Sequence, residues 1–136
     1  MKYLVDANVL SEATKSAPDG RVVEWLRENE REIAVDPVIV GEIRFGIYLL
    51  AAGSRQRRLE KWFVNGVERI RCLSWDAGTG VRWARLLADL RKAGESMPIK
   101  DSMIAATALV HGLAVVTRNG RDFGKAGVRV VDPFAR

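Results

Sequence analysis

Five short apolar runs rich in β-branched residues alternate with longer stretches whose apolar residues recur at helical spacing. The runs, which predict strands, are Tyr3–Val5, Ile33–Val35, Ile70–Leu73, Leu113–Val116 and Val128–Val131. The stretches, which predict helices, are Val22–Glu30, Pro37–Leu50, Arg55–Val67, Val81–Lys92 and Ser102–Val110. Strands that alternate with helices predict an α/β fold with a mostly parallel central sheet. Residues 1–136 have the length of one domain, and we expect them to form one.

The content of cysteine and histidine excludes several kinds of site. Cys72 and His111 are the only residues of their types, so there is no internal disulfide and no ligand cluster for zinc. Cys72 is better explained as a small apolar residue near a strand than as a nucleophile. The N-terminus lacks the features of a signal peptide, and no apolar run has the length of a membrane-spanning helix. We therefore expect a cytoplasmic protein.

Positive charge is concentrated in the second part of the chain. Residues 1–53 hold 6 basic and 9 acidic side chains, whereas residues 54–136 hold 16 basic and 8 acidic ones, so the net charges are −3 and +8. Residues 54–71 alone carry 6 basic and 2 acidic side chains. A run of this kind is often only a solvated helix face, but the asymmetry indicates an anionic partner, and nucleic acid is the leading candidate.

Acidic residues stand at the ends of predicted strands and on apolar helix faces. Asp6 follows the first strand, and Asp122 lies in the segment TRNGRDF after the fourth strand. Glu42 borders the apolar stripe of PVIVGEIRFGI, and Asp101 opens the helix that contains DSMIAATALV. Parallel sheets bind ligands beyond the carboxyl ends of their strands. If the first and fourth strands are neighbours, Asp6, Asn119 and Asp122 face one crevice.

Each acid taken singly has an ordinary structural explanation, as a turn residue, a helix-start acid or a tolerated boundary residue. Four acids at comparable positions nevertheless suit one pocket. Carboxylates packed together raise one another's pKa, and a hard divalent cation such as Mg²⁺ or Mn²⁺ relieves that repulsion. Acid-bound Mg²⁺ is suited to phosphoryl transfer, because it activates water and stabilises the leaving oxygen.

The segments YLVDANVLSE, PVIVGEIRFGI and KDSMIAATALVHGLAVVTRNGRDF resemble the PIN-domain family, in particular its VapC-type toxins, which include the FitB-like group. The resemblance implies a PIN-like three-layer α/β/α sandwich with about five strands. It also implies an endoribonuclease dependent on Mg²⁺ or Mn²⁺, a homodimer, and inhibition by a cognate VapB-type antitoxin, through which alone DNA is contacted. Carried over by position, the metal ligands and catalytic residues are Asp6, Glu42, Asp101 and Asp122, with supporting polar groups at Asn8, Ser11, Thr117 and Asn119. Ala7 departs from the pattern, since many relatives have Thr or Ser there.

The hypothesis for the mechanism is in-line attack by a metal-bound water on an RNA phosphate, which leaves 5′-phosphate and 3′-hydroxyl ends. The candidates for contacts to the RNA backbone are Arg118, Arg121, Arg55, Arg57, Arg58 and Lys61. Among the tryptophans, Trp62 is the best candidate for base stacking, although helix packing explains it better, and we expect Trp25 in the core.

Two alternatives remain open. A non-catalytic nucleic-acid-binding module would have the same fold, but it would not need a repulsive acidic cluster. A small Mg²⁺-dependent phosphatase or phospho-acceptor domain would use Asp6 as the nucleophile. A phosphatase with two acids two residues apart would need an acid where this chain has Asn8.

Overall fold

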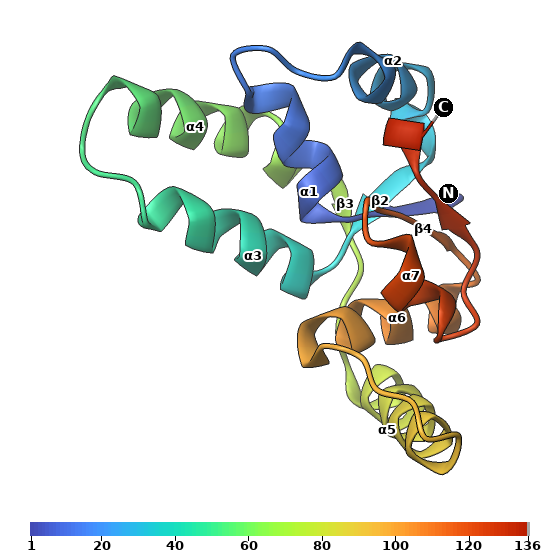
Figure 1. Cartoon of the computed structure of the whole chain (residues 1–136). Coiled ribbons are helices and arrows are strands. Elements are labelled where there is room, and N and C mark those ends of the chain that lie inside the picture. The colour runs from blue at the N-terminus through green and yellow to red at the C-terminus, as the bar shows by residue number, and fades with distance from the viewer. Residues whose placement is uncertain (136) are drawn as a thin grey trace.

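A computed structural model describes residues 1–135 and contains a parallel five-stranded sheet, as the sequence predicts (Figure 1). The strand order is β3-β2-β1-β4-β5. The strands are β1 (Tyr3–Val5), β2 (Ile33–Val35), β3 (Arg71–Cys72), β4 (Ala114–Val116) and β5 (Val130–Val131). The chain adds β2 and β3 on one side of β1 and then crosses back, through the two α-helices that lie between β3 and β4 in the sequence, to add β4 and β5 on the other side. The switch point of the strand order therefore lies between β1 and β4.

Helices cover both faces of the sheet and form the outer layers of a three-layer sandwich. The α-helices are α1 (Ala7–Leu10), α2 (Gly20–Glu28), α3 (Pro37–Tyr48), α4 (Ser54–Asn65), α5 (Ala77–Lys92), α6 (Ile99–His111) and α7 (Gly120–Gly124). Short 3₁₀ turns are η1 (Ser11–Thr14), η2 (Glu30–Glu32), η3 (Val67–Arg69) and η4 (Pro133–Ala135). Figure 1 shows α5 and α6 on one side of the sheet and α1 and α2 on the other. Within residues 1–135 no helix is both long and apolar enough to cross a membrane.

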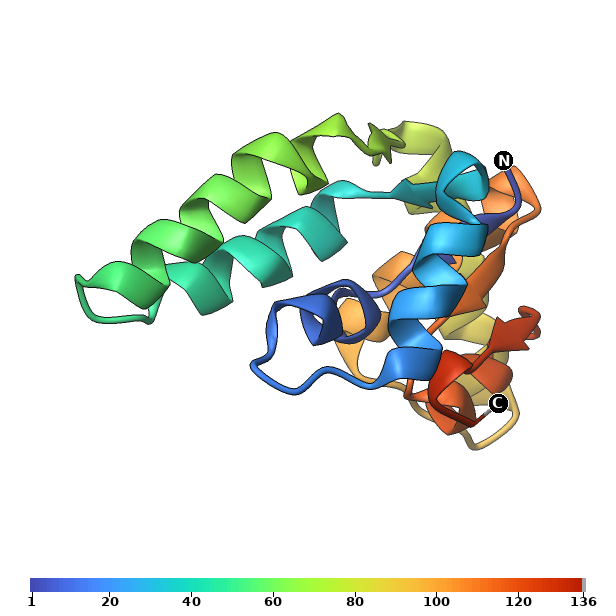
Figure 2. The ribbon, with the colours of Figure 1, turned by 90° about the horizontal axis from the view of Figure 1, so that it is seen from above.

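Helices α3 and α4 pair as a hairpin that extends away from the sheet (Figure 2). One contact between the two helices is the ion pair of Arg44 and Glu60, with 2.6 Å between Nη1 and Oε2. The Arg44 guanidinium also lies 4.5 Å from the centre of the Phe63 ring. The ion pair and the ring contact hold the two helices of the hairpin together.

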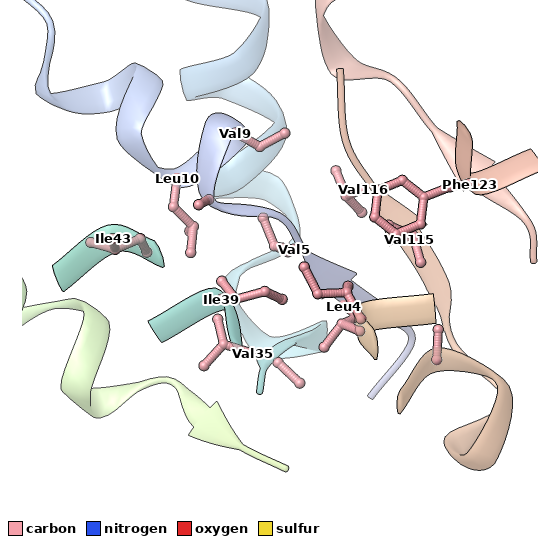
Figure 3. Close-up of a cluster of buried hydrophobic side chains, with 14 of the residues drawn as sticks. Leu4, Val5, Val9, Leu10, Val35, Ile39, Ile43, Val115, Val116 and Phe123 are labelled. Atoms are coloured by element: carbon pink, nitrogen blue, oxygen red, sulfur yellow. The ribbon is translucent and has the colours of Figure 1, made fainter. Parts of the chain in front are cut away.

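The core is built from strand residues that face the helices. Leu4 and Val5 of β1, with Val115 and Val116 of β4, are fully buried. Figure 3 shows them between Ile39 of α3 and Phe123 of α7. Burial of this central pair of strands on both sides explains why their sequences are continuous apolar runs rather than alternating ones.

The predicted elements exist, but several begin or end at other residues. Helix α5 begins at Ala77, four residues before the predicted Val81, because Asp76 caps it by accepting a hydrogen bond from the Thr79 amide. Helix α6 begins at Ile99, so Asp101 lies in its first turn rather than opening it. Helices α1 and α7 were not predicted, since four and five residues are too few to show a helical period.

Candidate active site at the carboxyl ends of the central strands

Strands β1 and β4 are neighbours, as the predicted crevice requires. They pair in parallel, with Leu4 opposite Val115 and Val5 opposite Val116. The backbone amide of Asp6 donates to the Val116 carbonyl at 2.9 Å, which extends the ladder to the point where both strands end. Asp6 and Thr117 therefore leave the sheet side by side.

Asp6 is buried, with an exposed fraction of 4%, and both of its carboxylate oxygens accept hydrogen bonds. The Ala7 amide donates to Oδ1 at 2.8 Å, and the Thr117 hydroxyl donates to Oδ2 at 2.8 Å. Burial raises the pKa of Asp6 to about 6, against the lowering effect of the Thr117 hydrogen bond. The negative charges of Glu42 and Asp101 raise this pKa further, so these acids belong to one electrostatic cluster.

Asn119 joins the two acids of α6 and α7. Its Nδ2 donates to Asp101 Oδ2 at 2.9 Å and to Asp122 Oδ2 at 3.0 Å. Burial is the main reason that the pKa of Asp101 is raised, and the charges of Asp122 and Glu42 add to it, while Lys100 and Asn119 lower it. Asp122 is more exposed and lies 3.6 Å from the Lys125 ammonium.

Glu42 reaches the cluster from the middle of α3. One of its oxygens, Oε2, lies 2.7 Å from the Lys100 ammonium, and this ion pair raises the pKa of Lys100. The other oxygen, Oε1, is buried and has no hydrogen-bond partner among residues 1–135. A buried carboxylate oxygen without a donor is costly, so Oε1 is the strongest single indication of a missing ligand.

The structure brings three of the four predicted supporting residues to the acids. Thr117 and Asn119 contact them as described above, and Asn8 donates to Asp6 Oδ2 at 3.3 Å while accepting from the Arg118 amide at 3.2 Å. Ser11 differs, because it begins η1 and its carbonyl accepts from the Thr14 hydroxyl. Among the described residues, no hydrogen bond joins the Ser11 side chain to Asp6, and the role of Ser11 in orienting that loop stays a prediction.

Two tryptophans that the sequence did not connect with the site hold the first turns of α6. Trp83 Nε1 donates to Ser102 Oγ at 2.9 Å, and Trp75 Nε1 donates to the Met103 carbonyl at 3.1 Å. Their rings pack edge to face, with 5.9 Å between the ring centroids. Ser102 and Met103 lie within two residues of Asp101, so these bonds hold the turn of α6 from which the Asp101 side chain projects.

The predicted RNA contacts divide into two groups. Arg118 and Arg121 are exposed and follow β4 beside the acids. The remaining four are exposed on α4, in the projecting hairpin: Arg55, Arg57, Arg58 and Lys61. Arg55 and Arg58 line a cavity with the Thr14–Ala17 loop. Trp25 is buried, as predicted, and Trp62 is half-buried against the core.

The donor set consists of carboxylate and amide oxygens, which suits a hard cation and not zinc. Glu42 Oε1 lacks a hydrogen-bond partner within the described residues 1–135, and burial with mutual repulsion raises the pKa of Asp6 and Asp101. Across residues 1–135, however, no three acidic, histidine or cysteine side chains already stand where they could hold a metal ion together. A cation shared by three of these acids would therefore need small shifts of their side chains, and Glu42 is held by its ion pair with Lys100 at 2.7 Å.

Comparison with known proteins gives this arrangement a family. Residues 3–128 match the PIN domain family model. VapC ribonuclease Y4jK of Sinorhizobium fredii is 33% identical, and the alignment covers 96% of each chain. Toxin FitB of Neisseria gonorrhoeae is 31% identical over 96% of this chain and 97% of its own. The structure of FitAB bound to the IR36 DNA fragment superposes with a TM-score of 0.91 at 29% identity, covering 97% of this chain and 95% of that one. The chain belongs to the PIN-domain family.

Proposed function

We propose that this protein is a metal-dependent endoribonuclease and that Asp6, Glu42, Asp101 and Asp122 hold its divalent cation. The observation that carries the proposal is the convergence of four acids from separate elements, in which Glu42 Oε1 is buried and has no partner in the part of the chain that the structure describes. The resemblance to a protein named as a ribonuclease supports RNA as the substrate. Mg²⁺ is the physiological cation in this proposal, and Mn²⁺ substitutes for it because both prefer oxygen ligands.

Each residue of the site then has a specific task. The four carboxylates would hold a divalent cation, which would supply an activated water for attack on the phosphate and positive charge for the leaving oxygen. The Thr117 hydroxyl and the Ala7 amide fix the Asp6 carboxylate, so the ligand is oriented before the cation arrives. Asn119 sets the separation of Asp101 and Asp122 through its two hydrogen bonds. Arg118 and Arg121 supply positive charge for the RNA backbone.

The relatives also support a partner. FitB carries the name of a toxin, and FitAB is a complex bound to DNA. We propose that this chain is likewise the toxin of a VapBC-type pair, that a VapB-type antitoxin inhibits it and contacts DNA for the complex, and that it forms a homodimer. Co-expression with the product of an adjacent antitoxin reading frame should abolish both RNA cleavage and the growth arrest caused by the toxin alone.

Purified protein and a mixed RNA substrate test the proposed activity. Cleavage should begin when Mg²⁺ or Mn²⁺ is added, stop with EDTA, and leave 5′-phosphate and 3′-hydroxyl ends. Asp101→Asn should lower the rate at least about a hundredfold, because it removes a charged ligand that acts on the developing charge. Asp89→Asn, an exposed acid on α5, is the matched control and should cleave at the parental rate. Equal cleavage by Asp101→Asn and the parent would refute the assignment.

The same assay separates the alternatives. A phospho-acceptor domain would trap a phosphoryl group on Asp6 and leave RNA intact. A non-catalytic module would bind RNA without producing new ends.

A further inference from the structure

Lys100 links the two helices that carry Glu42 and Asp101. It lies in the first turn of α6, directly before Asp101, and its ammonium contacts Glu42 of α3 at 2.7 Å. The two residues are 58 positions apart in the chain. Its side chain is 48% exposed, so Lys100 lies at the solvent-facing edge of the acidic cluster.

A lysine at this position is electrostatically unusual. The N-terminal turn of a helix carries partial positive charge, which disfavours a cation there and favours an acid such as Asp101. Lys100 is placed against that preference and beside Glu42, with Asp101 next in the chain. The neighbouring carboxylates compensate its charge, and it compensates theirs, since like charges packed together destabilise one another.

We propose that Lys100 is the internal counter-ion of the acidic cluster and that it leaves Glu42 when a divalent cation binds. This inference rests on the proposed metal site. Glu42 Oε2 cannot be held by an ammonium and shared with a cation without placing two positive groups side by side. The exposure of Lys100 gives its side chain a path outward into solvent.

Calorimetric titration with MnCl₂ tests the exchange without any measurement of activity. Lys100→Met removes the competing ammonium and keeps an unbranched apolar stem of similar length. It should bind Mn²⁺ about five- to tenfold more tightly than the parent, the effect expected for one partly screened ion pair. Lys92→Met removes the same charge from the exposed end of α5 and should bind Mn²⁺ within about twofold of the parent. Unchanged or weaker binding by Lys100→Met overturns the proposal.

A second variant guards against a folding defect. Lys100→Gln keeps a hydrogen-bond donor for Glu42 but no charge, and it too should bind Mn²⁺ more tightly. If the parent binds no Mn²⁺, the counter-ion and the metal site both fail. If both variants bind more tightly while the parent leaves RNA intact, the proposed nuclease fails and the counter-ion stands.

Discussion

Replacing Asp6 with asparagine should stabilise the protein at neutral pH in the absence of metal. Burial raises the pKa of this carboxyl from 3.8 to about 6, so the folded state at pH 7.5 must hold a charge that burial disfavours. The contribution of Asp6 to the free energy of unfolding is therefore complete only below about pH 4, where the carboxyl is protonated in both states, and it is lost as the pH rises through about 6. From these two pKa values the loss between pH 4.5 and 7.5 is about 2 kcal/mol.

Asparagine removes this loss at the expense of some hydrogen bonding. Its carbonyl oxygen can still accept from the Ala7 amide, and the Thr117 hydroxyl, which donates to Asp6 Oδ2 at 2.8 Å, can rotate and accept from the NH₂ group instead. The NH₂ group cannot accept from Asn8, as Asp6 Oδ2 does at 3.3 Å. One weak hydrogen bond contributes up to about 1 kcal/mol. At pH 7.5 the net gain in the free energy of unfolding should therefore be about 1–2 kcal/mol, and at pH 4.5 it should disappear.

Urea unfolding in EDTA at the two pH values measures this difference directly. Asp76→Asn is the control with the opposite sign, because hydrogen bonds from Thr79 lower the pKa of Asp76. That acid stabilises the fold above its ordinary pKa and loses the effect as the pH falls, so its variant should be less stable at pH 7.5. If Asp6→Asn is no more stable than the parent at pH 7.5, or if its advantage is equal at both pH values, the reasoning about burial is wrong.

Three further changes test the supports of the site. Asp36→Ala should lower the free energy of unfolding by about 2–3 kcal/mol, because it removes the cap of α3 and leaves the buried Thr107 hydroxyl without its acceptor at 2.7 Å. Thermal denaturation should show a loss of stability well above that of Asp76→Ala, which removes an exposed cap. Asn119→Ala should move the half-point of Mn²⁺ binding to higher pH. The hydrogen bond from Asn119 lowers the pKa of Asp101 in the parent, so its removal raises that pKa. A titration series from pH 5 to 8 measures the shift. Gly112→Ala should cost about 1 kcal/mol in urea unfolding, because the residue ends α6 at a φ of 66°, and a neutral result would show that this strain is absent.

The sequence predicted the site best where strand order alone determines which residues meet. Asp6 and Thr117 directly follow β1 and β4, so the parallel pairing of these strands is enough to bring them together. Asn119 follows two residues later at the same edge of the sheet, where its backbone amide donates to the Thr117 hydroxyl at 3.0 Å.

Contacts that depend on how helices pack could not be read from spacing. The pairing of Lys100 with Glu42 requires a particular approach of α6 to α3, and no local pattern encodes it. The buried bond from Thr107 to Asp36 joins the same two helices and was missed for the same reason. Ser11 was expected to support Asp6 because it matches the family's first motif, but in the structure it begins the turn η1, where its carbonyl accepts from the Thr14 hydroxyl.

Anomalous diffraction from crystals grown with MnCl₂ tests the central claim most directly. The account predicts a manganese peak bonded to the four acids Asp6, Glu42, Asp101 and Asp122, with the Lys100 ammonium withdrawn from Glu42. The Asp101→Asn protein, crystallised in the same way, should show a weakened peak or none. Full occupancy at a site remote from these acids, or an unchanged peak in Asp101→Asn, would contradict the claim that the acidic cluster is the metal centre.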